Sequence, residues 1–214
     1  MAGLSGTGRL ADDLYLMAHH EVSGRPHLQA RAIGLGLAGA LLAELMLTDM
    51  IRIAAGAVVT AGHPTTDDQL GRDVLHQMAS EHQERPVRDW LAFLARTAAR
   101  DVALRLARSG YLSQASTRRP WRGERWVPVD SDCAFAPVTR VKTALDPSRS
   151  ATAAGVALAG LAAGCGLGSR LSLYLPPGAY RHLDAAVHQL DPGLREVIAQ
   201  TQAAVDSALL AHRV

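Results

Sequence analysis

Arginine and tryptophan alternate between residues 118 and 126, and both side chains suit a phosphate-bearing surface. The residues are Arg118, Arg119, Trp121, Arg122, Arg125 and Trp126. The guanidinium group is a planar fork of donors that pairs with phosphate oxygens. Tryptophan settles at the headgroup level of a membrane, or stacks on the bases of a nucleic acid. The stretch therefore predicts recognition of a phosphate-rich partner, either a membrane surface or a nucleic acid.

Positive charge is concentrated around this stretch. Residues 85–125 contain ten arginines against three acidic residues, an excess of seven, whereas the whole chain has a formal net charge of only +2. By subtraction, the remaining residues are net negative by about five. The sequence thus predicts one basic region on an otherwise slightly acidic protein.

Turn-forming residues separate two short extended segments, Tyr111–Ala115 and Trp126–Val129, which predicts a hairpin with a basic tip. Gly110 is expected to end the helix before it, Ala98–Ser109. A helix followed by a basic hairpin also resembles a winged-helix DNA-binding module, over residues 98–129. The hairpin therefore has three interpretations: a membrane contact, a nucleic-acid contact, or a packing and dimerisation element with solvated arginines.

The glycines from Gly34 to Gly39 match the spacing G-x-G-x-x-G of dinucleotide sites. Such a site needs a strand before the glycines and an acidic residue about 20 positions later. The preceding segment has no strand pattern, and position 54 is Ala. The small residues are instead expected to let a helix pack closely against its neighbours.

The remaining polar residues form no recognisable catalytic or metal-binding pattern. His19 and His20 are adjacent, and no other histidine or cysteine spacing suits a metal site. The acidic pairs Asp12-Asp13 and Asp67-Asp68 lie near predicted helix starts, where capping explains them, and Thr66 is a further candidate cap. We therefore predict a protein that is not an enzyme and binds no metal or cofactor.

The fold is predicted to be mostly α, a single domain without a membrane-spanning segment. Two nearly uncharged helices, Arg31–Leu47 and Ser150–Leu173, are expected at its centre, and amphipathic helices outside them. The stretch Ser150–Ser169 is long enough to cross a bilayer but is mostly Ala and Gly, so a core helix is favoured. Met1–Leu10 contains no apolar run typical of a signal peptide. Two unpaired cysteines suit a cytoplasmic protein.

The segment Ile33–Ile53 is similar to the start of the Golgi phosphoprotein 3 family, with a helix of the pattern G-L-x-G-x-x-L-x-E-L closed by a short strand. The matching residues are Gly36, Leu37, Gly39, Leu42, Glu44, Leu45 and Leu47. Further segments that resemble the family are Val87–Leu91, Leu106–Leu112 and the basic hairpin. Arginine in place of lysine, with much Ala and Gly, indicates a bacterial, actinobacterial-type member.

The resemblance implies one helical domain over residues 10–214, with a buried multi-helix core and a projecting β-hairpin. It also implies a peripheral membrane protein of the cytoplasm that binds phosphatidylinositol 4-phosphate or another anionic lipid and can act as an adaptor for a protein partner. The hairpin is a candidate for homo-oligomerisation. Nucleic-acid binding through residues 118–126 is the alternative function.

The headgroup site of the family is matched in part. The family's tryptophan corresponds to Gln29 here, and its arginine within G-L-R-G corresponds to Ala38. Arg96 matches a third position, while Arg31 and Arg100 lie nearby in sequence. We therefore predict Arg31, Arg96 and Arg100 as headgroup ligands and leave the identity of the anionic lipid open.

Overall fold

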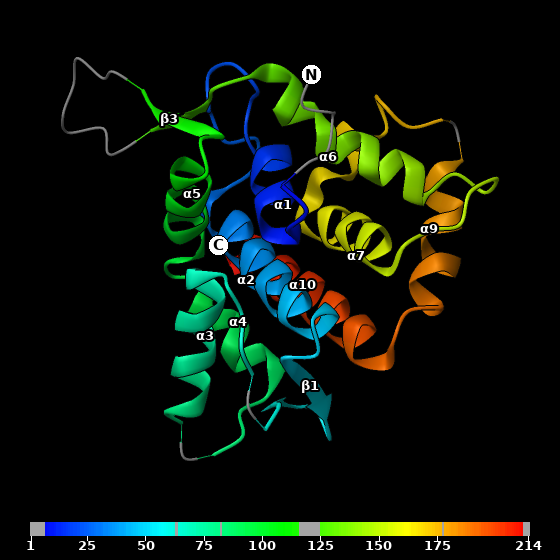
Figure 1. Ribbon diagram of the computed structural model, residues 1–214. Helices are drawn as coiled ribbons and strands as arrows, with labels where there is room; N and C mark the ends of the chain where they lie inside the picture. Colours follow the sequence, from blue (N-terminus) through cyan, green and yellow to red (C-terminus); the bar gives the residue numbers. More distant parts are fainter. Residues whose placement is uncertain (1–6, 63, 82, 116–124, 177, 212–214) are drawn as a thin grey trace.

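Helices carry most of the chain, and the strands among the described residues form two small antiparallel hairpins (Figure 1). The computed structural model describes residues 7–62, 64–81, 83–115, 125–176 and 178–211. The elements are α1 (Leu10–Ala18), α2 (Ala30–Leu47), β1 (Ile51–Ala54), β2 (Ala57–Thr60), α3 (Gln69–Ala79), α4 (Val87–Leu94), α5 (Ala98–Arg108), β3 (Leu112–Gln114), β4 (Trp126–Pro128), α6 (Ser131–Ala144), α7 (Ala153–Ala162), the π-helical turn η2 (Ala163–Leu167), α8 (Gly168–Leu171), α9 (Ala179–His188) and α10 (Pro192–Ala211).

Helix α2 lies at the centre and contacts α1, α4, α5, α7 and α10 (Figure 1). Its residues are buried on all sides of the helix, as the near absence of charge predicts. Helices α3, α4 and α5 lie on one side of this core, and α6 and α9 lie on the other (Figure 1). These observations confirm the prediction of a single, mostly α-helical domain with a buried helical core.

The glycines of α2 allow neighbouring helices to approach closely. A Cβ atom at Gly34 would lie 2.5 Å from the carbonyl oxygen of Ala95, a distance that real Cβ atoms do not reach. A Cβ atom at Gly36 would collide with the sulfur of Cys165, and one at Gly39 with the hydroxyl of Thr201. The G-x-G-x-x-G spacing therefore serves helix packing, as predicted.

The predicted helix Ser150–Leu173 is interrupted. It consists of α7, the turn η2 and α8, and Gly166 within η2 has a φ of 95°, which only glycine adopts easily. Ala30–Leu47 and Ala153–Leu171 are both long and apolar enough to cross a membrane. However, 78% and 61% of the residues in their apolar windows are buried inside the protein, as in the core helices of other folds.

Two antiparallel hairpins are present among the described residues, and the second is the one predicted from the basic segment. In the first, Ala54 pairs with Ala57 across the turn Ala55-Gly56, whose φ angles of 50° and 78° suit a tight hairpin turn. In the second, β3 pairs with β4 from Leu112–Pro128 to Gln114–Trp126, and this hairpin lies at the edge of the molecule (Figure 1). Gly110, with a φ of 80°, ends α5 as expected.

Two of the capping expectations were wrong and one was confirmed. Asp12 does not cap α1, because that helix begins at Leu10 and Asp12 is buried inside the protein. Thr66 does not cap α3. Asp68 caps it, as expected of the pair Asp67-Asp68, since its carboxylate accepts a hydrogen bond from the amide of Gly71. Helix α6 begins at Ser131, where Asp130 caps it by accepting a hydrogen bond from the amide of Asp132.

Candidate anion-binding site and a buried ion cluster

The predicted headgroup ligands come from the start of α2 and from the segment that joins the end of α4 to the start of α5. Gly34 of α2 packs against the carbonyl of Ala95, the residue that directly precedes Arg96 in the linker between α4 and α5. Arg31 lies three residues before Gly34, so it lies on the same face of α2, about one turn towards the start of the helix. Arg100 lies in the first turn of α5. Because all three arginines are exposed, their guanidinium groups are available to a ligand.

The starts of α2 and α5 carry partial positive charge, whereas Ala95, the residue in contact with Gly34, is the C-cap of α4, where the carbonyl groups carry partial negative charge. The side chains of the cap residues, Gln29 for α2 and Thr97 for α5, make no capping hydrogen bond. The first amide groups of a helix point outwards and carry about half a unit of positive charge, so they favour an anion. The three exposed arginines and the two helix starts therefore make this region the candidate anion site.

The two departures from the family pattern have different surroundings. Gln29 is exposed, at the start of α2, and so remains close to Arg31. Ala38 is fully buried, on the stripe of α2 that faces away from solvent. Position 38 therefore contributes nothing to an anion site here, which leaves Arg31, Arg96 and Arg100 as the candidates.

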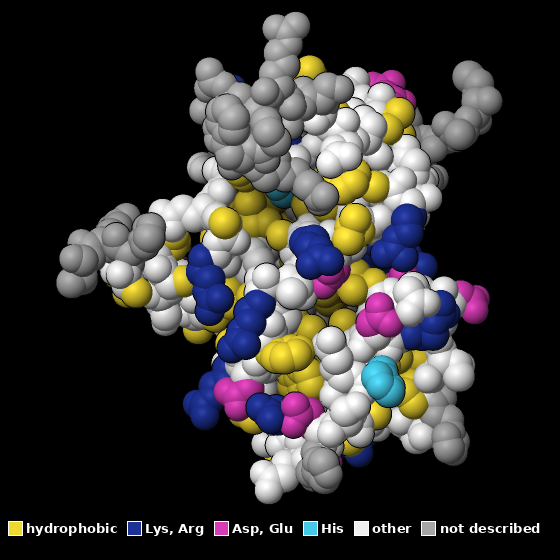
Figure 2. Space-filling model, turned by 90° about the vertical axis from the view of Figure 1, so that its left-hand side faces the viewer, with side chains coloured by type: hydrophobic (Ala, Val, Ile, Leu, Met, Phe, Trp, Pro, Cys, Tyr) yellow, Lys and Arg dark blue, Asp and Glu magenta, His cyan; other side chains and the backbone are white. Residues whose placement is uncertain are grey.

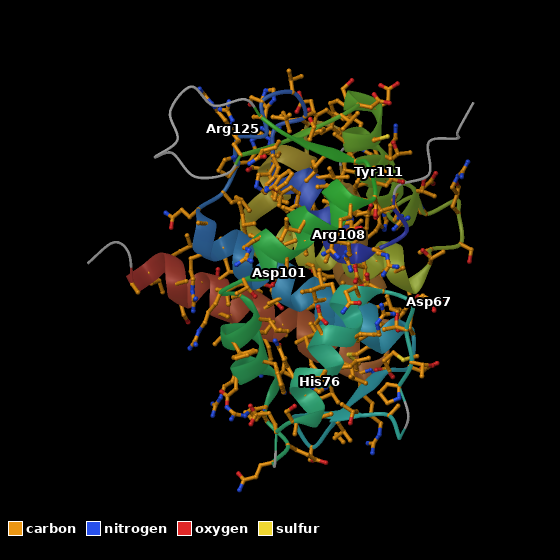
Figure 3. The ribbon with its side chains drawn as sticks, turned by 60° about the vertical axis from the view of Figure 1, so that its left-hand side comes forward. Asp67, His76, Asp101, Arg108, Tyr111 and Arg125 are labelled. Atoms are coloured by element: carbon orange, nitrogen blue, oxygen red, sulfur yellow. The ribbon has the colours of Figure 1, made fainter. Side chains whose placement is uncertain are left out.

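Basic residues continue from α5 towards the second hairpin. Figure 2 shows basic side chains in the middle of the face formed by α3, α4 and α5, among hydrophobic side chains. In Figure 3, Asp101 lies near the start of α5, Arg108 lies further along it, and Arg125 lies at the base of the hairpin. Arg108 and Arg125 are both exposed.

The predicted hairpin residues are only partly described. Arg118, Arg119, Trp121 and Arg122 lie outside the described residues. Arg125 is exposed, whereas Trp126 is half-buried and packs against the hydrophobic core. Of the two tryptophans, Trp126 therefore has a structural role at the base of the hairpin.

Arg105, one of the ten arginines in the basic segment, forms a buried ion cluster that the sequence pattern did not predict. Its Nε donates to Asp12 Oδ1 over 2.7 Å, and its Nη1 donates to Asp68 Oδ2 over 2.9 Å. Nη1 and Nη2 each donate to one carboxylate oxygen of Glu44 over 3.1 Å. One guanidinium group thus joins the helices α1, α2 and α5 to the start of α3.

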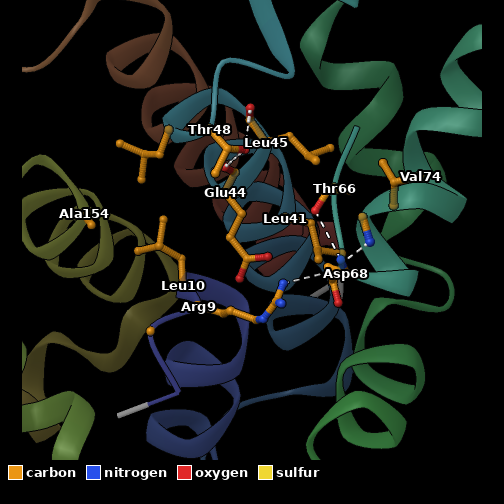
Figure 4. A pocket seen from close by; sticks show the side chains of 13 residues that line it. Arg9, Leu10, Leu41, Glu44, Leu45, Thr48, Thr66, Asp68, Val74 and Ala154 are labelled. Atoms are coloured by element: carbon orange, nitrogen blue, oxygen red, sulfur yellow. Dashed lines mark hydrogen bonds and ion pairs between the residues drawn. The ribbon is translucent and has the colours of Figure 1, made fainter. Parts of the chain in front are cut away.

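The cluster is closed by two further contacts. The same oxygen of Asp68, Oδ2, also lies 3.2 Å from Nη1 of Arg9, and Glu44 Oε1 accepts a hydrogen bond from the amide of Ala11. Three carboxylates then face two guanidinium groups, which leaves a formal charge of −1. A cavity of about 170 Å³ lies beside the cluster and is lined by Arg9, Glu44, Asp68 and several leucines (Figure 4).

Burial controls the protonation of the cluster. Desolvation raises the pKa of Asp12 to about 6, despite the opposing charge of Arg105. Burial alone would lower the pKa of Arg105, but the charges of Glu44 and Asp12 outweigh it and raise that pKa. The carboxyl group with the raised pKa, Asp12, does not line the cavity. Because Arg105 and Arg9 already occupy the carboxylates, we interpret the cluster as structural.

A second buried pair lies next to it. Asp13 is completely buried, and its Oδ2 lies 2.5 Å from Nη1 of Arg140 on α6. Desolvation raises the pKa of Asp13 to about 6 against the opposing effect of Arg140. The adjacent residues Asp12 and Asp13 therefore anchor α1 to different helices, which is why neither serves as a cap.

Glu44 was the one visible signal of the cluster, as the single charge in the apolar part of α2. Its partner Arg105 could not be told apart in sequence from its exposed neighbours Arg100 and Arg108. Among the described residues, no group of three His, Cys, Asp or Glu side chains is placed to hold a metal ion.

The chain matches the family model of Golgi phosphoprotein 3 (GPP34) over residues 10–209. It belongs to the Golgi phosphoprotein 3 family. Glu44 and Leu45 of the G-L-x-G-x-x-L-x-E-L pattern, which suggested the family, lie in α2 beside Arg105 and the cavity. No curated protein matches the sequence. Golgi phosphoprotein 3 proteins are known as binding or adaptor proteins rather than enzymes.

Proposed function

We propose that the protein is a non-enzymatic peripheral membrane protein that binds anionic lipid headgroups, such as those of phosphoinositides, through Arg31, Arg96 and Arg100. The observation that carries the proposal is the contact between Gly34 and Ala95, which brings the start of α2 next to Arg96. Two helix starts and three exposed arginines then provide positive charge for one phosphate group. Membership in the Golgi phosphoprotein 3 family supports the same function.

The arginine site alone gives weak binding. Each arginine near an anionic surface contributes about 1 kcal/mol, so three contribute about 3 kcal/mol, which corresponds to a millimolar or weaker dissociation constant. We propose that the hairpin supplies the remainder, through Arg118, Arg119 and Arg122 as charges and Trp121 as an inserted side chain. Dimerisation through the hairpin would strengthen binding further, because two sites then act together.

Vesicle binding tests the headgroup site. The parent protein should sediment with vesicles that contain a phosphoinositide or phosphatidylserine, and not with pure phosphatidylcholine. The variant with Arg31, Arg96 and Arg100 replaced by Ser should lose about two orders of magnitude in affinity. A matched control replaces the exposed residues Arg52, Arg149 and Arg181 by Ser, which removes the same charge from other elements. Equal loss in both variants would show that only net charge matters.

The hairpin is tested separately. Replacing Arg118, Arg119 and Arg122 by Ser should weaken binding and reduce its dependence on salt, because exposed charges are screened within about 10 Å at 0.1 M salt. Replacing Trp121 by Ala should weaken binding and leave the salt dependence unchanged. If both variants bind as well as the parent, the hairpin is not a membrane contact. Sedimentation of the same variants without vesicles tests dimerisation.

Binding to duplex DNA distinguishes the alternative function, nucleic-acid binding, from the proposed membrane binding. A nucleic-acid-binding protein should shift duplex DNA in a salt-dependent manner and lose vesicle binding in competition with it. The proposed membrane protein should bind vesicles in the presence of excess DNA.

An adaptor role and a cytoplasmic location belong to the same proposal. Capture of a membrane protein partner only in the presence of anionic vesicles would support them.

A further inference from the structure

Most of the exposed large hydrophobic side chains lie at one end of the molecule. Among the described residues, seven such side chains are exposed, and five of them come from the loop after α1, the start of α6 and the turn after α8. These five are Val22, Val129, Phe135, Leu173 and Tyr174, which together we call the apolar end. The other two, Phe93 and Leu210, lie on α4 and α10.

Direct contacts hold the segments of the apolar end together. Gly24, in the loop after α1, touches the carbonyl of Trp126 so closely that a Cβ atom would not fit. The rings of Phe135 and Tyr174 meet edge to face with centroids 6.0 Å apart. In Figure 1 the loop after α1, the start of α6 and the turn after α8 all lie in the upper part of the molecule, the first two next to the β3–β4 hairpin and the third on the opposite side.

The shape of the apolar end suits a deformable partner. Leu173 is 75% exposed and Val22 is 70% exposed, so each projects from its turn rather than lining a groove. The cleft between their segments, lined by His27, Phe135 and Tyr174 among others, has a volume of only about 30 Å³. A protein partner would need separate pockets for each projecting side chain, whereas the acyl region of a bilayer accommodates them without matching shape.

The charges around the apolar end also suit a lipid surface. Arg25 and Arg125 are exposed there, and Arg170 lines the cleft. Three acidic residues, Glu21, Asp130 and Asp132, are also present. Glu21 lies 3.7 Å from a ring nitrogen of His20, and Asp130 faces the positive start of α6 as its cap. Apolar side chains next to arginines are typical of segments that lie in the headgroup region.

We infer that the apolar end inserts into the headgroup and upper acyl region of a membrane, with Val22 and Leu173 as the deepest side chains. This inference rests on the proposed membrane function and adds a contact separate from the headgroup arginines. The two contacts differ in their dependence on salt, because insertion of apolar side chains is not screened whereas binding by arginines is. Membrane binding therefore has a component that persists at high salt.

The test is vesicle partitioning at low and high salt with the variant Val22→Ser/Leu173→Ser. Both side chains are largely exposed, so the variant is expected to fold. Transfer of each side chain from water to the membrane should change partitioning about tenfold, so the double variant should bind about a hundredfold more weakly at both salt concentrations. The matched control is Leu210→Ser, since Leu210 is 65% exposed on α10. The control should bind like the parent.

A label on Cys133 measures insertion of the apolar end into the membrane independently of binding affinity. It lies in the first turn of α6 beside the apolar end and is partly exposed, whereas Cys165 is buried. A polarity-sensitive fluorophore on Cys133 should shift to shorter wavelength when the protein meets vesicles. The same label at Leu210→Cys, in a Cys133→Ser background, should not shift.

The outcomes separate this inference from the proposed function. Unchanged partitioning of the Val22→Ser/Leu173→Ser variant, together with no shift at Cys133, would overturn the inference while leaving headgroup binding intact. Equal binding of the parent to neutral and anionic vesicles, lost in the same variant, would support the inference and refute the anionic-lipid function. If the variant instead loses a dimer seen by sedimentation and keeps vesicle binding, a second copy covers the apolar end and the inference is wrong.

Discussion

Replacing Arg105 by methionine should destabilise the protein strongly, because it removes the cation that joins three carboxylates. The side chain of Arg105 is 7% exposed, and methionine retains much of its volume. Glu44 would keep its hydrogen bond from the amide of Ala11, and Asp68 would keep Arg9 and the amide of Gly71. Asp12 would lose the guanidinium group that holds it, although it is only 2% exposed.

The expected cost follows from leaving buried charge without a partner. Removing one member of a buried ion pair typically costs about 3–5 kcal/mol, which is a large part of the total stability of a domain. For a domain of this size, about 4 kcal/mol should lower the midpoint of thermal unfolding by about 8–16 °C. The measurement is urea and thermal unfolding followed by circular dichroism. The control is Arg108→Met, one turn further along α5, where the exposed side chain donates to the carbonyl of Leu104 and makes no ion pair with another described residue.

The pH dependence of the same variant provides a second check. Arg105 lowers the pKa of Asp12, so its removal should raise that pKa above its present value of about 6. A carboxyl group with a raised pKa in the folded state takes up a proton as the pH falls, which relieves the penalty. Arg105→Met should therefore lose less stability at pH 5 than at pH 8. Stability within about 1 kcal/mol of the parent at pH 8 would refute the structural role of the cluster.

Two further variants have defined outcomes. Asp13→Asn removes a carboxyl group whose pKa is raised by burial from 3.8 to about 6. As the pH falls from 7.5 to 5, the parent should therefore gain about 1 kcal/mol of unfolding free energy relative to the variant. Urea unfolding at the two pH values measures this difference. A constant difference between them would contradict the raised pKa. Gly39→Ala should cost about 2–3 kcal/mol in the same assay, because its Cβ atom would collide with the Thr201 hydroxyl on α10. Gly62→Ala is the control, since nothing lies within 4 Å of a Cβ atom at that position. Equal stability of the two variants would show that α2 and α10 can move apart without a cost in stability.

The local sequence was sufficient for the helix and hairpin positions that depend on nearby residues. The break after α5 follows from Gly110, and the tight first hairpin follows from the turn at Gly56, because glycine allows positive φ angles. The interruption at Gly166 could not be predicted in the same way. Glycine occurs throughout α7 and η2, and tertiary packing decided which one adopted the positive φ.

The sequence by itself determined the family, the helical class and the central position of α2, because these depend on composition and on a pattern of apolar and small residues. Only the tertiary structure decided the role of individual charges. Asp12 and Arg105 are 93 residues apart, and their pairing required α1 and α5 to pack on α2. Arg105, Arg100 and Arg108 share one short helix and one residue type, yet burial makes the first a structural ion-pair partner and leaves the others exposed. Burial depends on which face of α5 meets the core, a property that residue type and spacing along the chain do not specify.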